Sequence, residues 1–528
     1  MRLISKIGSL SIVTMVTLLS VSCNNGLDSV ADEGSKENTD AQLTSFSTGR
    51  TLKAPKVTRT SANNHQYLGG ADFMWEAGDN ILVKDDNNNW QTSVSSNITG
   101  TQASAKFRLG GTYHAGSGYD VRYVGNSTSA YTVTIATVQT QEYTNSMKHF
   151  GASGDCGTAM AVRVGDHFEF MLDHKASYLC FLPRVTNEEL GRNIFLTHII
   201  VKSDDNIAGV YNLDRTHLYG SGSSKEIRLN TIGAGALRGF PLNISTTNVG
   251  HNAAYMVIAP GTHNLTVEYY IKDPATNTEA VITKNLGSVT YEANKFYDIT
   301  ANLTPQNYSG KYYMWDAAPG ADYWMGHEAT QSKIPAQRGT DYATSAADAR
   351  WYNSYNTSSL SSTVATRSAA ACPNANEILW LVQRGDAHWD SDTFWSTLGH
   401  LYKGGMWIKK SAVIAAENGV TVPYMKTKAP DGNNYVNSTL NAYYKNNTVV
   451  QGKPANTSDY IYIPALGDYE LGYFNLAGQV GFYWSSTSSP FMRPGNAYPL
   501  AYYLYISKDE ITLYDYFCYD GFQLWELQ

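Results

Sequence analysis

The sequence predicts a mainly β protein, in which two tandem antiparallel β-sandwiches are followed by an α+β domain. Three observations carry this prediction. From Asp72 to Leu303, apolar and polar residues alternate with a period of two, which is typical of half-buried strands. No helical apolar pattern separates these runs, so hairpins and Greek-key connections are expected to link them. After Pro305 the composition changes, because nine of the 11 Trp and 24 of the 38 Tyr lie in residues 306–528.

Composition and charge exclude several classes of protein. The 528 residues suggest about three domains. Apolar residues make up 42% and charged residues 16%, which indicates a globular chain. The net charge of −7 argues against the basic surface that nucleic-acid-binding proteins usually present, so no nucleic-acid partner is expected.

Residues 1–23 are predicted to be a lipoprotein signal peptide. A positively charged start precedes the apolar stretch Ile7–Val21, which is too short to span a membrane, and small residues stand directly before Cys23. This arrangement resembles a lipobox, although Leu19 lies one position further from Cys23 than the usual leucine. We therefore expect Cys23 to be lipidated; the alternative is an ordinary secretory signal that happens to end near a cysteine.

Residues 24–59 are predicted to be a tether followed by a removable strand. The tether is polar and acidic, with no residues that would form a core. Ala41–Thr48 then has a short strand-like pattern. Arg50 and Arg59 follow in loop-like sequence that a protease could reach, and both are candidates for proteolytic processing. The alternative is that they are ordinary surface arginines.

The first sandwich is predicted over residues 60–188 and the second over residues 189–305. The strand His167–His174 alternates cleanly, and Ser177–Leu182 is its expected neighbour. We interpret His167 and His174 as surface residues, because no carboxylate or cysteine pattern accompanies them. No metal and no cofactor are predicted.

Several stretches of this part resemble the fimbrillins, the lipoprotein pilins of anaerobic Gram-negative bacteria. The resemblance covers about residues 44–303 and rests on the order and spacing of Phe73–Asp79, Phe168–His174, Ala176–Phe181, Tyr255–Pro260, Leu265–Val267 and Lys295–Ile299. It implies two pilin-like sandwiches, export as a lipoprotein to the outer membrane, and later assembly into a fimbrium at the cell surface.

The resemblance also implies a mechanism of assembly. A trypsin-like protease cuts such a pilin after an arginine, and loss of the first strand opens a groove that a donor strand from a neighbouring pilin subunit fills. In this chain the lost strand would lie near Ala41–Thr48, and the cut would fall at Arg50 or Arg59. The sequence does not choose between the two arginines.

The C-terminal domain, residues 306–528, is expected to contain both helices and strands. Helical patterns are found at Asn374–Arg384 and Ser391–Tyr402. Strand patterns are found at Tyr460–Pro464, Gly481–Trp484, Ala501–Ile506 and Glu510–Tyr514. Asp386, His388, Asp390 and Asp392 precede or begin the second helical pattern, where we interpret them as helix caps rather than ligands.

Three motifs of this domain, Cys372–Ile378, Gly481–Thr487 and Ala501–Ser507, resemble FISUMP or major-paralogue domains, which we associate with C-type-lectin-like architecture. The family's terminal cysteine motif is not matched, because Cys518 stands before Gly521–Leu524. A Cys372–Cys518 disulfide and a Cys156–Cys180 disulfide are candidates; the alternative is that these are free, buried thiols. The calcium-binding strings of C-type lectins are absent, so that chemistry is not carried over.

The aromatic surplus suggests a binding surface. Trp351, Tyr352, Tyr355, Phe491 and Tyr498 lie in loop-like sequence and are the candidate ligand-binding residues, whereas Trp380, Trp395 and Trp484 lie in apolar patterns and are expected in the core. No nucleophile, metalloprotease or phosphate-binding motif is present, so we do not expect an enzyme.

These observations favour a fimbrial tip subunit or adhesin, assembled by proteolytic processing and donor-strand exchange. The second sandwich ends near Leu303, and a folded domain follows where a stalk pilin would supply its own donor strand. The C-terminal domain is then expected to face a glycan or protein on a host or microbial surface. The alternative is a surface glycan-binding lipoprotein that stays on its lipid anchor and does not polymerise; an enzyme of the lectin-like class is a third, weaker reading.

Overall fold

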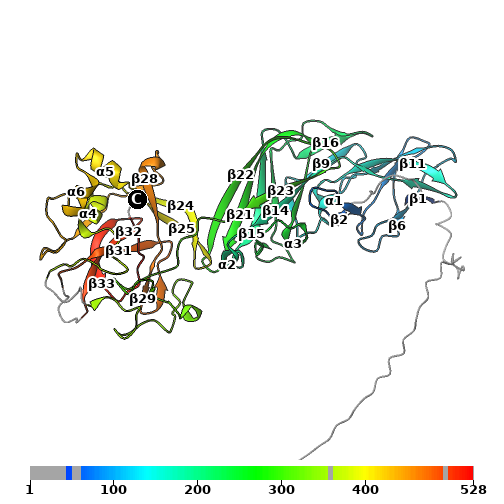
Figure 1. Ribbon diagram of the computed structural model, residues 1–528. Helices are drawn as coiled ribbons and strands as arrows, with labels where there is room; N and C mark the ends of the chain where they lie inside the picture. The colour runs from blue at the N-terminus through cyan, green and yellow to red at the C-terminus, as the bar shows by residue number, and fades with distance from the viewer. Residues whose placement is uncertain (1–42, 50–60, 355–360, 492–497, 527–528) are drawn as a thin grey trace, which may run out of the picture. The chain divides into compact units, whose positions relative to one another are not determined.

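The computed structural model describes residues 43–49, 61–354, 361–491 and 498–526, and it confirms a mainly β fold. Strands of the N-terminal, central and C-terminal parts of the chain form separate sheets (Figure 1). No helix among the described residues is long and apolar enough to cross a membrane.

The N-terminal sheet contains the strands that come first in the chain. Its order is β5 (Trp90–Thr92), β4 (Leu82–Lys84), β8 (Tyr119–Tyr123), β11 (Gly157–Val164), β12 (His167–Phe170), β1 (Thr44–Thr48), β7 (Lys106–Leu109) and β6 (Ser95–Ser96), with β13 (Asp173–His174) paired to β11. A separate ladder joins β2 (Ser61–Asn63) to β3 (Asp72–Met74). The core of this part is rich in aromatic side chains, including Phe46, Trp75, Phe107 and Phe168.

The central sheets have a largely aliphatic core. One sheet has the order β10 (Val138–Thr140), β18 (Glu226–Asn230), β15 (Phe195–Ser203), β21 (Gly261–Asp273) and β22 (Thr278–Tyr291), with β19 (Phe240–Pro241) paired to β15. A second contains β20 (Ala254–Ile258), β14 (Ser177–Arg184) and β23 (Phe296–Asn302), and a third contains β17 (Leu218–Tyr219), β16 (Gly209–Leu213) and β9 (Thr132–Ile135).

The boundary predicted near residue 188 does not separate these sheets. Strands β9, β10 and β14 all precede it, yet each pairs with a strand that follows it. The pairing expected between His167–His174 and Ser177–Leu182 is wrong, since β12 pairs with β11 and β1 while β14 pairs with β20 and β23. Alternation along a strand indicates which side chains face the core, but it carries no information about the partner strand.

The surface interpretation of His174 is also wrong. Its side chain is fully buried, and its Nδ1 lies 2.9 Å from Oδ1 of the equally buried Asp155. His167 is partly exposed and lies beside Asp166 and Glu169.

The C-terminal domain combines sheets with helices, as predicted. Its helices are α4 (Ala375–Arg384), α5 (Ser411–Glu417) and α6 (Val422–Thr427). One sheet has the order β27 (Val450–Gln451), β24 (His388–Thr397), β25 (His400–Lys409) and β28 (Tyr460–Pro464). Another has the order β26 (Tyr444–Asn446), β33 (Ile511–Phe517), β32 (Leu500–Ser507) and β31 (Val480–Ser488), and β29 (Asp468–Glu470) pairs with β30 (Tyr473–Asn475). Short helical turns elsewhere are α1 (Phe150–Ser153), α2 (Glu188–Gly191), α3 (Val249–Asn252), η2 (Glu328–Thr330) and η4 (Thr457–Asp459).

Of the two expected helices, the first is confirmed and the second is wrong. Helix α4 begins after Asn374, whose side chain and that of Glu377 form a capping box. The stretch expected as a second helix is instead part of the β24–β25 hairpin, which turns at Leu398 and Gly399 with φ of 52° and 76°. The helix-like spacing of apolar residues is misleading here, because a bulge in β24 breaks the strict alternation of a strand.

Of the residues interpreted as caps of that helix, His388, Asp390 and Asp392 stand on β24, and Asp386 lies in the loop before it. Asp390 does hold a local turn: its carboxylate accepts hydrogen bonds from the backbone N–H groups of Asp392 and Thr393, both at 2.9 Å, and from the Trp407 indole at 3.0 Å. The carboxylate stabilises the bulge in β24, which is a structural role.

Candidate functional site

The removable strand predicted at residues 41–48 corresponds to β1, and β1 lies inside the N-terminal sheet. It pairs in antiparallel fashion with β7 on one side and in parallel fashion with β12 on the other. The Thr48 N–H donates to the Ala105 carbonyl at 3.0 Å, and the Gly49 N–H donates to the Phe170 carbonyl at 3.0 Å. Strand β1 thus satisfies backbone groups of both neighbours.

The side chain of Phe46 anchors β1 in the aromatic core. It is 0% exposed. Its ring stacks on Phe168 with centroids 5.0 Å apart, and it meets the edge of Tyr113 at the same distance. A strand this short makes few backbone hydrogen bonds, so burial of Phe46 supplies much of its attachment.

Several predicted processing residues lie outside the described residues. These are the lipidation candidate Cys23 and the cleavage candidates Arg50 and Arg59.

An aromatic pocket in the C-terminal domain brings together two of the predicted ligand-binding residues, Trp351 and Tyr498. The pocket has a volume of about 230 Å³, and it is lined by Met314, Tyr323, Tyr342, Ala343, Thr344, Trp351, Leu471, Tyr498 and Tyr519. Tyr498 meets Tyr519 edge to face at 5.1 Å. The lining offers several ring faces and few charged groups, which suits a small ligand with apolar faces, such as one sugar ring.

A buried arginine fixes the loop that carries Trp351. The Arg350 side chain is 5% exposed and pairs with Asp348, with its Nη2 at 2.6 Å from Asp348 Oδ2. Its Nη1 donates to the carbonyls of Asp341 at 2.8 Å and Tyr323 at 3.3 Å. The wall of the pocket is therefore held before any ligand enters.

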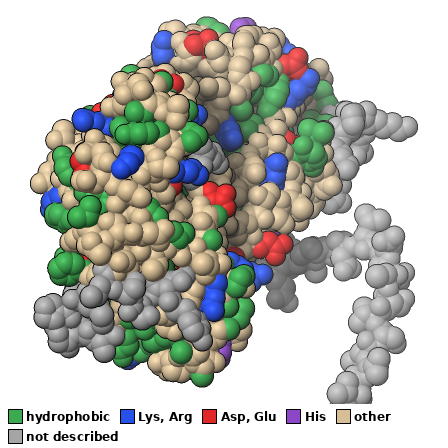
Figure 2. All heavy atoms as spheres, turned by 60° about the vertical axis from the view of Figure 1, so that its left-hand side comes forward, with side chains coloured by type: hydrophobic (Ala, Val, Ile, Leu, Met, Phe, Trp, Pro, Cys, Tyr) green, Lys and Arg blue, Asp and Glu red, His purple; other side chains and the backbone are tan. Residues whose placement is uncertain are grey.

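The remaining predicted ligand-binding residues do not line this pocket. Tyr352 is half-buried and its ring lies 4.9 Å from that of Trp351, while Tyr355 lies outside the described residues. Phe491 lines a different hollow together with Tyr443 and Tyr514. Figure 2, in which the side of the C-terminal domain comes forward, shows hydrophobic side chains in separate groups among polar ones.

Sequence reasoning missed Tyr342 and Tyr519 as pocket residues. Both are flanked by residues of mixed polarity, so only the fold places their rings beside Tyr498 and Trp351. Burial raises the pKa of Tyr519 to about 12; its hydroxyl, like that of an ordinary tyrosine, is protonated and able to donate at neutral pH.

Two carboxyl groups are buried beneath this part of the domain. Asp468 stands on β29 and Asp520 follows β33; one carboxylate oxygen of Asp468 and both of Asp520 have no hydrogen-bond partner among the described residues. Burial, followed by the charge of Glu470, raises the pKa of Asp468 to about 8. Burial also raises the pKa of Asp520 well above its usual range.

The four described cysteines are free, buried thiols. Cys372 and Cys518 belong to the same hydrophobic cluster, whereas Cys156 and Cys180 belong to two different clusters. Burial raises the pKa of each thiol above its ordinary value, which makes these cysteines poor nucleophiles.

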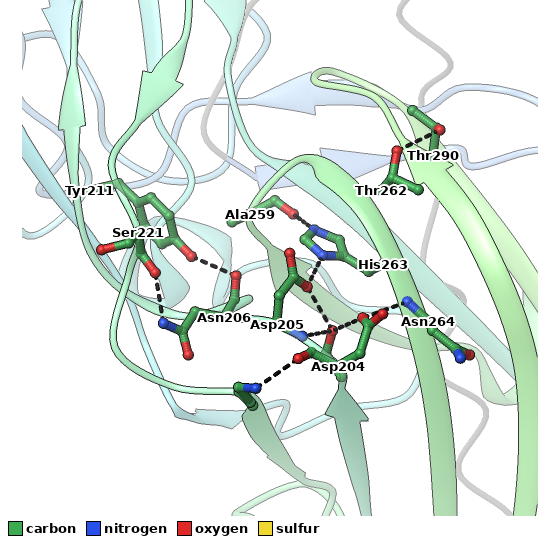
Figure 3. A network of polar contacts seen from close by, with 12 residues as sticks. Asp204, Asp205, Asn206, Tyr211, Ser221, Ala259, Thr262, His263, Asn264 and Thr290 are labelled. Carbon is green, nitrogen blue, oxygen red and sulfur yellow. Dashed lines mark hydrogen bonds and ion pairs between the residues drawn. The ribbon is translucent and has the colours of Figure 1, made fainter.

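A polar network in the central sheets is a structural clamp rather than a ligand site (Figure 3). Nδ1 of His263 lies 2.5 Å from Oδ1 of Asp205, and its Nε2 lies 3.1 Å from the Ala259 carbonyl oxygen. The Asn264 N–H donates to Asp204 at 2.8 Å. Each of these groups has its partner within the network, which ties the loop after β15 to the start of β21.

Sequence reasoning also missed one potential metal-binding cluster. His65, Cys180 and Asp298 each place a ligand atom within 4.8 Å of the others. They are separated by more than a hundred residues along the chain, so no motif spacing indicates them.

Comparisons with known proteins find weak similarities to solved structures only. No protein-family model matches the sequence, and no curated protein matches it. The solved structure of a "putative cell adhesion protein" from Bacteroides ovatus is 13% identical and covers 49% of this chain and 92% of its own, with a TM-score of 0.30. A structure with the same description from Bacteroides uniformis is 16% identical and covers 51% and 95%, with a TM-score of 0.28. A fimbrial protein from Bacteroides ovatus is 12% identical and covers 57% of each chain, with a TM-score of 0.23. A likeness of this degree assigns neither family nor function to the chain.

Proposed function

We propose that this chain is a cell-surface adhesin of the fimbrial type, which binds partners and catalyses no reaction. The observation that carries the proposal is the position of β1. A strand near the start of the chain lies between β7 and β12, and it is followed by a stretch that contains two arginines. A cut in that stretch would leave β1 attached to the sheet by non-covalent contacts alone.

Loss of β1 would create a site for a donor strand. The facing edges of β7 and β12 would expose unpaired backbone groups, and the space left by Phe46 would be an apolar slot beside Phe168. An added strand with a large apolar residue would satisfy both, which is the physical basis of strand addition. We propose that another pilin subunit supplies this strand after cleavage at Arg50 or Arg59.

We further propose that the subunit caps the fimbrium and that Cys23 anchors its precursor to the outer membrane by a lipid. The C-terminal domain is folded, and opening it to release a donor strand would cost on the order of 5–15 kcal/mol. A subunit that only accepts a strand has one neighbour, which places it at a tip. The aromatic pocket would then face a host or microbial surface.

The alternative function is a glycan-binding lipoprotein that stays on its lipid anchor and does not polymerise. The aromatic pocket around Trp351 and Tyr498 favours glycan binding in either case. The two functions differ at the mature N-terminus. Mass spectrometry should find a start after Arg50 or Arg59 for the fimbrial subunit, and a lipidated Cys23 for the anchored lipoprotein.

The decisive test is strand exchange in vitro. A site for a specific protease is placed within residues 51–60, the folded protein is cut there, and labelled peptide of residues 41–50 is added in excess. We expect the cut protein to incorporate the peptide and the uncut protein not to do so. A peptide with Phe46→Ala is the matched control and should exchange poorly.

Two results would count against the proposal. One is a cut protein that never exchanges its strand, even under mild denaturant. The other is equal incorporation of the Phe46→Ala peptide, which would mean that the apolar slot does not select the strand.

The tip position has a test of its own. Immunogold labelling along the whole fimbrial shaft would contradict the capping role.

A further inference from the structure

Three side chains of different chemical type meet in a buried cluster between the segment before β3 and two adjacent central strands. Cys180 on β14 lies directly opposite Asp298 on β23 in a parallel register, and His65 approaches both from the turn after β2. One ligand atom from each residue lies within 4.8 Å of the other two. His65 Nε2 and Asp298 Oδ1 lie 3.5 Å apart.

The cluster is buried and its polar atoms are incompletely satisfied. The side chains of His65 and Asp298 are each 1% exposed, and Cys180 is 0% exposed. Neither His65 Nε2 nor Asp298 Oδ1 makes a hydrogen bond of acceptable geometry with a described residue. Burial of such groups without partners is costly, so the arrangement calls for a compensating contact.

The opposite sides of these two residues are held in place. His65 Nδ1 lies 3.3 Å from the Tyr255 hydroxyl, and Asp298 Oδ2 accepts a hydrogen bond from the Leu68 N–H at 2.5 Å. Residues that ligate a metal are commonly oriented in this way by a partner on their outer side. Nε2 and Oδ1, which make no hydrogen bond with a described residue, thereby lie 3.5 Å apart beside the Cys180 side chain.

We propose that His65, Cys180 and Asp298 form a binding site for a divalent transition-metal ion, and that zinc suits it best. A sulfur, an imidazole nitrogen and a carboxylate oxygen are ligands that zinc accepts together, with a water molecule in the fourth position. Tetrahedral zinc sets its ligand atoms about 3.3–3.8 Å apart. Because all three ligand atoms already lie within 4.8 Å of one another, no pair needs to close by more than roughly 1.5 Å to reach this spacing.

The protonation states of the residues determine the proton balance of metal binding. Burial lowers the pKa of His65, which keeps the imidazole neutral and able to ligate. Burial and then the charge of Asp298 raise the pKa of the Cys180 thiol, so without a cation the sulfur keeps its proton. Binding of the ion would form the metal–sulfur bond and release that proton to solvent.

An access route lies beside His65. A hollow of about 560 Å³ is lined mainly by polar residues, and both His65 and Tyr255 contribute to its wall. A bound ion would join the segment before β3 to β14 and β23. It would thus fix the stretch of chain that follows Arg59, whether or not that arginine is cut.

The test measures metal binding by the purified full chain under reducing conditions. Elemental analysis should find about one zinc per chain, removable with a chelator, and zinc should raise the melting temperature of the stripped protein. Cobalt should give the charge-transfer absorption of a thiolate–metal bond. We expect Cys180→Ser to abolish this absorption and His65→Ala to weaken metal binding at least tenfold.

Cys156→Ser is the matched control, because Cys156 is an equally buried free thiol in another cluster, and it should leave binding unchanged. Asp298→Asn, which conserves size, serves if another variant fails to fold, and it too should weaken binding. Stripped wild-type protein that shows neither a cobalt absorption nor a zinc-dependent melting shift would overturn the proposal. So would metal affinity that Cys180→Ser leaves intact.

Discussion

The N-terminal sheet and the C-terminal domain are both completed by a short segment, but the two segments are attached differently. In the N-terminal sheet, β1 fills the space between β7 and β12. In the C-terminal domain, the segment after β33 plays a similar part. Phe522 stacks on Trp484 at 4.3 Å, its carbonyl accepts from the Tyr313 N–H at 2.8 Å, and the Trp484 N–H donates to the Gln523 carbonyl at 3.0 Å. The first segment precedes a stretch with two arginines, whereas the second follows directly from a strand of its own sheet.

This difference shows that the same mode of packing, a short segment anchored by one buried aromatic ring, can be permanent or exchangeable. A segment that continues from its own sheet makes a closed domain. A segment that one cut can free makes an exchangeable site, because its contacts no longer benefit from being joined to the chain. Phe522 therefore stays in the C-terminal domain, whereas Phe46 can be replaced by an aromatic residue of another strand after a cut.

The largest expected effects come from removing the aromatic anchor of each segment. Phe46→Ala and Phe522→Ala should each lower the free energy of unfolding by about 3–5 kcal/mol, since both rings are fully buried. Urea denaturation followed by hydrogen exchange should place the loss from Phe46→Ala in the N-terminal sheet and that from Phe522→Ala in the C-terminal domain.

Tyr143→Ala is the control, because this aromatic side chain is 54% exposed and its loss should change stability by no more than about 0.5 kcal/mol. If Phe46→Ala also loosened the C-terminal domain, the two regions would be energetically coupled and the comparison would fail.

A pH-dependent effect concerns Asp468, which stands on β29 in the C-terminal domain. The pKa of its carboxyl is raised to about 8 in the folded protein, whereas an unfolded aspartate has a pKa near 3.9. Between these values the folded state binds the extra proton, so the stability of this domain should fall as the pH rises from about 4 to about 8 and level off above that.

Asp468→Asn should flatten this dependence. At pH 8 it should raise the free energy of unfolding by up to about 5 kcal/mol, since the pKa is raised by about four and each unit corresponds to about 1.4 kcal/mol. Thermal melts of the two proteins from pH 4 to pH 9 provide the measurement, and the exposed Asp509→Asn is the control. Parallel pH profiles for Asp468→Asn and the unmodified protein would show that this carboxyl does not titrate as inferred.

Features set by neighbouring residues can be predicted from the sequence, and features set by long-range contacts cannot. The capping box of Asn374 and Glu377 lies within four residues, and the prediction of helix α4 is confirmed. The short strand pattern around Phe46 is equally local, and β1 is a strand. The partners of β1, β12 and β14 depend on contacts between distant parts of the chain, so alternation alone assigns the wrong neighbour to β12.

The candidate sites follow the same rule. Trp351 and Tyr498 are candidates because they lie in loop-like sequence, and both line the aromatic pocket. Phe491 is a candidate for the same reason but lies in another hollow, because loop character does not say where a ring points. The cluster of His65, Cys180 and Asp298 has no local signature, since adjacent strands and one turn bring it together.

The smallest expected effect on stability, and the most direct on function, is at the aromatic pocket. Tyr498 is 44% exposed, so Tyr498→Ala should change the free energy of unfolding by no more than about 0.5 kcal/mol. Stacking on an aromatic face is worth about 0.5–1.5 kcal/mol, so the variant should bind a sugar ligand roughly two- to tenfold more weakly. An array of defined glycans probed with the full chain would identify a ligand, and calorimetric titration with that glycan would give the affinities.

Phe491→Ala is the matched control, because the Phe491 ring is similarly exposed but lines the other hollow, and this variant should bind the glycan as tightly as the unmodified protein. Should Phe491→Ala weaken binding while Tyr498→Ala does not, the hollow beside Tyr443 and Tyr514, and not the aromatic pocket, would be the binding surface of this domain.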